Sequence, residues 1–137
     1  GNVVVLFFGY TNCPDICPAT LLYYTRVKRE LGVLAEDVRF VFVTVDPEHD
    51  TPEHLERFVG RFDPSFYGLT GDPDEISQVA RDYGVYVERM EDNTSPAGYW
   101  IVHGTLSYVI DSEGNLRLAH PFGVKPEHIA EDLRKLL

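Results

Sequence analysis

The sequence predicts a single α/β domain with a mostly parallel central sheet, flanking helices and a C-terminal β-hairpin. Its 137 residues are enough for one domain with its own core, here taken as residues 1–137. Apolar runs of strand length alternate with helical patterns along the first half, which is typical of parallel sheets covered by helices. The last third instead carries two strand-like runs around a turn signal, which predicts an antiparallel hairpin.

The first half of the chain predicts alternating strands and helices. The run 3–9 is apolar at nearly every position, as expected of a central strand buried on both faces. Pro18 suits the first position of the helix that follows, and Gly32 ends its apolar stripe. Thr51 and Pro52 form the N-cap and first residue of the next helix. In order, these elements are a strand at 3–9, a helix at 18–31, a strand at 38–45 and a helix from 52 to about 62.

The second half predicts one more covering helix and then the hairpin. Asp72-Pro73 begins a helix that Gly84 ends, and residues 91–98 are polar and rich in breakers, which indicates a loop. The stretch 111–114 carries the turn signal of the hairpin. The expected elements are a short strand at 67–70, a helix at 73–83, strands at 105–110 and 116–120, and a helix after Pro126.

The two cysteines of the chain lie together where the first strand ends. Cys13 and Cys17 form a C-x-x-x-C turn, and this spacing suits either a disulfide or two thiolates on one soft metal ion. Proline follows each cysteine, so we expect Cys17 at the N-cap of the helix and Cys13 in the preceding turn. Both sulfurs would then lie near a helix N-terminus, which favours thiolate. An α/β domain with such a turn after its first strand predicts a thioredoxin-like arrangement.

A structural disulfide or two unreactive buried thiols is the competing interpretation of this pair. Closing so short a loop stabilises a protein little, which disfavours the structural disulfide.

Histidine distinguishes metal chemistry from redox chemistry. His103 ends the apolar run 99–102, and in the predicted fold this junction faces the cysteine turn, although a core histidine with satisfied hydrogen bonds is the alternative. We expect His49 to be a surface residue or a wall of the site, His54 to lie on the polar face of its helix, His120 to be structural and His128 to face solvent.

Charge and hydropathy exclude two classes of partner. The net charge is −10 and the sequence has no cluster of Lys and Arg, so we expect no binding to nucleic acid. The longest apolar run, residues 3–8, is far too short to span a bilayer.

Three segments of the chain resemble the Sco/SenC family. They are Phe8-Gly9-Tyr10-Thr11-Asn12-Cys13-Pro14-Asp15-Ile16-Cys17-Pro18, Val45-Asp46-Pro47-Glu48-His49-Asp50-Thr51-Pro52, and His103-Gly104-Thr105 followed by Ser107-Tyr108-Val109-Ile110-Asp111. Members of this family are membrane-tethered copper proteins that serve assembly of the dinuclear copper centre of cytochrome c oxidase. The resemblance implies that Cys13, Cys17 and His103 bind copper, as Cu(I) and Cu(II), with Asp46 touching the oxidised metal or its surroundings.

The resemblance also implies partners and a location. The partners would be the copper-bearing subunit of the oxidase and other copper chaperones. The domain would be held by an N-terminal anchor, outside this sequence, at the extracytoplasmic face of the inner (plasma or mitochondrial) membrane. Val102 departs from the aspartate that usually precedes the ligand histidine, and Gly104 from the serine that often follows it, so support for the imidazole is expected to differ.

Two functions from different classes therefore compete. The first is a copper-binding assembly factor, a carrier rather than a turnover enzyme. The alternative is a thiol-disulfide oxidoreductase of thioredoxin type that reduces the copper-ligand cysteines of a client. A thiol peroxidase is disfavoured, because Tyr10 precedes Cys13 where peroxiredoxins place a threonine. A redox or copper sensor stays open.

Overall fold

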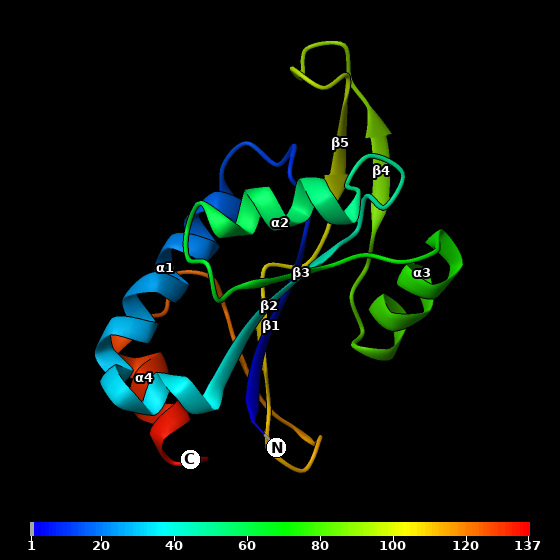
Figure 1. Ribbon diagram of the computed structural model, residues 1–137. Helices are drawn as coiled ribbons and strands as arrows, with labels where there is room; N and C mark the ends of the chain where they lie inside the picture. Colours follow the sequence, from blue (N-terminus) through cyan, green and yellow to red (C-terminus); the bar gives the residue numbers. More distant parts are fainter. Residues whose placement is uncertain (1) are drawn as a thin grey trace.

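The computed structural model describes residues 2–137, which form one α/β unit (Figure 1). The elements in chain order are β1 (Val3–Gly9), α1 (Ile16–Leu31), the 3₁₀ segment η1 (Gly32–Asp37), β2 (Val38–Thr44), α2 (Pro52–Gly60), β3 (Tyr67–Leu69), α3 (Pro73–Asp82), β4 (Glu88–Glu91), β5 (Tyr99–Val102), β6 (Ser107–Ile110), β7 (Leu116–His120) and α4 (Pro126–Arg134). Within these residues, no helix combines the length and the apolar character needed to cross a bilayer.

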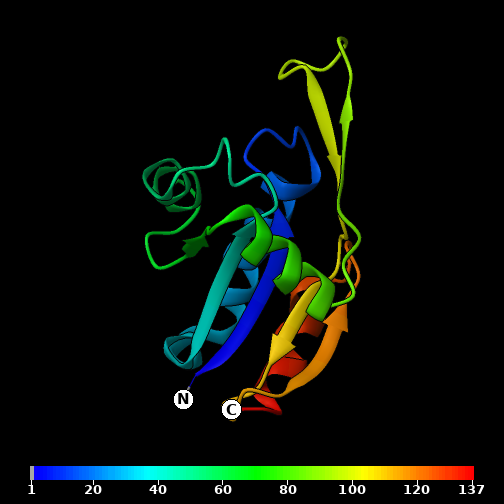
Figure 2. The ribbon, with the colours of Figure 1, turned by 90° about the vertical axis from the view of Figure 1, so that its right-hand side faces the viewer.

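The central sheet has five strands in the order β3-β2-β1-β6-β7. The pairs β1–β2 and β2–β3 are parallel, whereas β6 is antiparallel to both β1 and β7. Four strands therefore share one direction and β6 alone runs against them, which confirms the predicted mostly parallel sheet with its C-terminal hairpin. Helices α1 and α4 pack together on one face, and α3 covers the other (Figures 1 and 2).

Strand β1 lies at the centre of the sheet and of the core. It pairs with β2 on one side and β6 on the other, so its side chains point into both covered faces. Val5, Phe7 and Phe8 are almost completely buried, as is Phe42 on the neighbouring strand. This burial explains the unbroken apolar run 3–8, and it holds the end of β1, where the cysteine turn begins, on a rigid base.

The start of α1 corrects one sequence-based prediction. The N-cap is Asp15 rather than Cys17, so Cys17 lies inside the first helical turn. Pro18 follows it without breaking the helix, because the first four N–H groups of a helix have no intrahelical partner for proline to remove. The first intrahelical bond instead joins the Ala19 N–H to the Asp15 carbonyl at 3.1 Å.

A second, two-stranded sheet forms an arm that projects from the domain (Figure 2). Strands β4 and β5 are antiparallel, with Glu88 opposite Val102 and Glu91 opposite Tyr99. All four residues of β4 are exposed and three of them are charged, so no alternating apolar pattern marked it as a strand. The polar stretch between the strands is a loop, as predicted, although Glu91 itself belongs to β4.

Candidate metal centre

The cysteine turn begins where β1 ends at the carboxyl edge of the sheet. The Cys13 N–H donates to the Tyr10 carbonyl at 3.1 Å, which closes the turn. Gly9 allows the buried Cys17 sulfur to approach the strand: a Cβ at this position would lie 2.7 Å from Cys17 Sγ and 2.8 Å from Phe42 Cε2. A side chain at position 9 would therefore occupy space that the sulfur needs.

His103 comes from the segment that follows β5 and reaches the two cysteines, as the sequence predicted. One donor atom each from Cys13, Cys17 and His103 lies within 4.8 Å of the others. The His103 Nε2 is 3.6 Å from Cys17 Sγ, across 86 residues of sequence. Both cysteines are free thiols. The three side chains thus form a group that could hold one metal ion.

The backbone and two aromatic rings orient the His103 imidazole. Its Nδ1 lies 2.8 Å from the Gly104 carbonyl oxygen, and since a carbonyl only accepts, Nδ1 carries the proton. In the neutral imidazole, Nε2 is then the bare nitrogen and faces the sulfur, which is the state a metal ligand needs. Phe7 and Tyr10 contact the ring edge-on, with centroids 5.8 and 5.7 Å away. Val102 is exposed and does not help to orient the imidazole. The Gly104 carbonyl supplies the support for the ring that the sequence alone did not identify.

The two thiols differ strongly in acidity. Cys17 is 0% exposed, and this burial raises the pKa of its thiol far above the usual range. The hydrogen bond with Cys17 is the largest cause that lowers the pKa of the Cys13 thiol well below its usual value. Cys13 is also the more accessible of the two, at 9% exposed. At neutral pH Cys13 is therefore the thiolate, and Cys17 donates to it.

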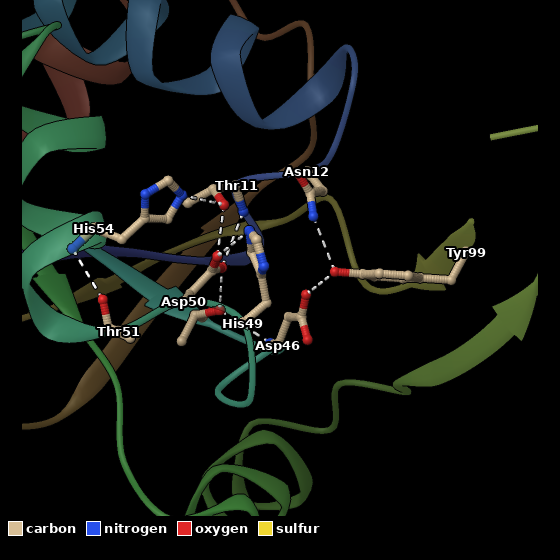
Figure 3. A network of polar contacts seen from close by, with 9 residues as sticks. Thr11, Asn12, Asp46, His49, Asp50, Thr51, His54 and Tyr99 are labelled. Carbon is tan, nitrogen blue, oxygen red and sulfur yellow. Dashed lines mark hydrogen bonds and ion pairs between the residues drawn. The ribbon is translucent and has the colours of Figure 1, made fainter. Parts of the chain in front are cut away.

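Asp46 lies at the carboxyl end of β2, buried, beside the cysteine turn rather than within the three-residue group (Figure 3). The Tyr99 hydroxyl donates to its carboxylate and accepts from Asn12 Nδ2 at 3.0 Å. Burial, and then the hydrogen bond to Asp46, raises the pKa of Tyr99 to about 12, so the phenol stays protonated. Two successive hydrogen bonds thus connect Asp46, through Tyr99 of the arm, to Asn12, the residue before Cys13.

No sequence pattern had identified Tyr99 or Asn12 as parts of this network. They are 87 residues apart, and Tyr99 is one apolar residue among others in its run. The Tyr10 hydroxyl makes a second hydrogen bond between the arm and the start of the cysteine turn, since it accepts from the Ile101 N–H at 3.1 Å. The arm is therefore attached to the cysteine turn at two points.

Three of the other histidines lie where the sequence predicted, whereas His54 contacts the Thr11 hydroxyl through its Nε2 at 3.0 Å. His120 is buried, with Nε2 2.9 Å from an Asp132 carboxylate oxygen, and His128 is exposed. His54 is half-buried on α2. His49 is an exposed residue of the loop after β2, and it lies next to Asp50 rather than in the cysteine site.

A comparison with protein families identifies the chain. The family model described as SCO1/SenC matches residues 1–137. The chain belongs to the SCO1/SenC family. An SCO2-like protein of Rickettsia conorii is 34% identical over 134 residues, which cover 98% of this chain and 65% of that protein. Protein SCO1 homolog 1, mitochondrial, of Arabidopsis thaliana is 40% identical over 119 residues, or 84% of this chain and 34% of that protein. The chain thus spans less than two thirds of these relatives.

The fold also matches solved SCO1/SenC structures. Bradyrhizobium japonicum ScoI, solved with copper bound, superposes with a TM-score of 0.90 at 37% sequence identity. The match covers 100% of this chain and 86% of that one. This likeness confirms the single thioredoxin-like domain of the family.

Proposed function

We propose that this chain is a copper-binding assembly factor of cytochrome c oxidase, with Cys13, Cys17 and His103 as its copper ligands. The convergence of these three donors carries the proposal. Two sulfurs and one imidazole make a soft, three-coordinate donor set suited to Cu(I). A structural zinc site usually has four protein ligands, and the Asp46 carboxylate is engaged by Tyr99.

The site also suits a carrier, because it is held firmly and lies near the surface. The Gly104 carbonyl keeps a bare nitrogen directed at the sulfurs, so little reorganisation is needed for binding. Cys13 is already a thiolate, so copper competes with no proton there at neutral pH. A site at the sheet edge, in which Cys13 is less deeply buried than Cys17, allows a partner to take the ion. Asp46 would act beside the oxidised metal rather than as a direct ligand, because it lies outside the three-residue group and its carboxylate is engaged by Tyr99.

The partners we propose are the copper-bearing subunit of the oxidase and other copper chaperones that load the site. One solved relative, BsSco, is described as a member of the Sco family of cytochrome c oxidase assembly proteins, and another relative of this chain is mitochondrial by name. We accordingly propose that the domain works at the extracytoplasmic face of an inner membrane, tethered there by a segment outside this sequence.

A second function, reduction of a client disulfide, has its own supporting observation. The Cys13 thiolate is the accessible sulfur and Cys17 the buried thiol that donates to it. In thiol-disulfide exchange, Cys13 would attack a client disulfide and form a mixed disulfide with the client. Cys17, after losing its proton, would then attack Cys13, releasing the reduced client and leaving a Cys13–Cys17 disulfide. The step consumes the chain's two thiols and needs a partner to reduce them again.

One experiment on one sample tests both functions. The reduced protein is titrated with Cu(I) without oxygen, in competition with a chelator, and is then assayed for thiol-disulfide exchange. We expect one tightly bound copper, lost in Cys13→Ser and in Cys17→Ser and unchanged in His128→Ala, which alters an exposed histidine on α4. Tight copper binding that survives either cysteine substitution would contradict the proposed site. Rapid exchange with no copper binding would favour the reductase.

A further inference from the structure

A second group of metal-binding side chains lies beside the cysteine turn, outside the site described above. One donor atom each from His49, Asp50 and His54 lies within 4.8 Å of the others. The two imidazoles contact each other edge-on, with centroids 5.3 Å apart. Figure 3 shows these three side chains gathered around Thr11, two residues before Cys13.

Asp50 is the rigid member of this group. It is 0% exposed, and its carboxylate accepts hydrogen bonds from the Thr11 N–H at 3.0 Å, the Thr11 hydroxyl at 2.5 Å and the Thr44 hydroxyl at 2.7 Å. These three donors hold the carboxylate in one orientation. A buried negative charge attracts a cation more strongly than an exposed one, because the surrounding dielectric is low.

The two histidines complete the group from the solvent side. His49 Nε2 is 3.8 Å from Asp50 Oδ1, and its side chain is 45% exposed. His54 lies in the first turn of α2, where its N–H donates to the N-cap Thr51 hydroxyl at 3.2 Å. Its Nε2 is 3.0 Å from the Thr11 hydroxyl, a contact that an incoming cation would replace. One side of the group is therefore buried and fixed, and the other is open to an arriving ion.

We propose that His49, Asp50 and His54 bind a divalent transition-metal ion, of the Zn²⁺ or Cu²⁺ class, separately from the thiol site. Two imidazoles and one carboxylate are donors that suit these borderline ions, and solvent supplies the remaining positions. The thiol site has softer donors. One edge of the sheet thus presents two sites of different chemistry, joined by the turn 11–13. The second site does not depend on the proposed copper function, since it shares no ligand with it.

The test uses a background that removes the thiol site, Cys13→Ser/Cys17→Ser/His103→Ala. Calorimetric titration of this variant with Zn²⁺ is expected to give one bound ion. Adding His49→Gln or His54→Gln is expected to weaken binding by about tenfold or more, because each removes one of three protein ligands. His128→Gln on α4 is the matched control and is expected to change nothing. With Cu²⁺, paramagnetic resonance is expected to show imidazole nitrogen couplings that weaken in the His54→Gln variant.

Two results would overturn the proposal. One is a background variant that is folded by circular dichroism and binds no Zn²⁺. The other is equal affinity in the His49→Gln, His54→Gln and His128→Gln variants, which would mean that the ion binds elsewhere. Neither result bears on Cu(I) binding by the unmodified protein, so failure here is distinguishable from failure of the proposed function.

Discussion

Substituting Gly9 by alanine is expected to damage both the stability of the fold and the copper site. The added Cβ would lie 2.7 Å from Cys17 Sγ and 2.8 Å from Phe42 Cε2. Both residues are 0% exposed, so neither side chain has free space into which to move. Overpacking of this kind costs about 1–3 kcal/mol of unfolding free energy. With a urea dependence of about 1–3 kcal/mol per molar, the unfolding midpoint should fall by about 1 M.

The same clash should reach the ligands, because the displaced atom is a sulfur of the site. Cu(I) affinity, measured by chelator competition, is expected to fall by about tenfold or more in Gly9→Ala. Gly68→Ala is the matched control: its Cβ would lie 2.9 Å from Leu55 Cβ, away from the site, so it should lower stability and leave copper affinity unchanged. An unchanged unfolding midpoint in Gly9→Ala, or an equal loss of copper affinity in Gly68→Ala, would refute the reasoning.

Three further predictions concern the site. His103→Ala should weaken Cu(II) binding strongly and Cu(I) binding less, because two thiolates can hold Cu(I) in near-linear geometry, and it should barely change the disulfide potential. Since the folded pKa of Cys13 is lowered, iodoacetamide should alkylate Cys13 and not Cys17 at pH 6, as mass spectrometry would show. Tyr99→Phe should cost about 1–3 kcal/mol in urea unfolding, because buried Asp46 loses a hydrogen-bond donor.

Each of these predictions has an outcome that contradicts it. If His103→Ala keeps its copper affinity and loses reductase activity, His103 tunes a thiol and the reductase function replaces the carrier. Equal alkylation of both cysteines at pH 6 would mean that their acidities do not differ. If Tyr99→Phe unfolds at the same urea concentration as the unmodified protein, the hydrogen bond from Tyr99 to Asp46 does not stabilise the fold. Tyr86→Phe, at an exposed tyrosine, is the control.

Much of the fold could be predicted from local patterns. The buried run of β1, the caps of α2 and α3 and the turn of the C-terminal hairpin lie within a few residues of where the sequence placed them, because each depends on neighbours along the chain. The start of α1 was misplaced because a proline at the third helical position is as acceptable as one at the first. Strand β4 was missed because it is fully exposed, and no burial imposes a pattern on it.

The sequence by itself determined the chemistry. It places two cysteines on one turn and the imidazole of His103 directly after the apolar run 99–102, and these donors are soft enough for copper. Only the tertiary structure decided the geometry. It turned His103 so that its bare nitrogen faces the sulfur, made Cys13 acidic and Cys17 inert, and engaged Asp46 with Tyr99. It also brought His54 to Thr11 across 43 residues. These properties depend on burial and on contacts between distant segments, which exist only once the sheet has brought its strand ends to one edge.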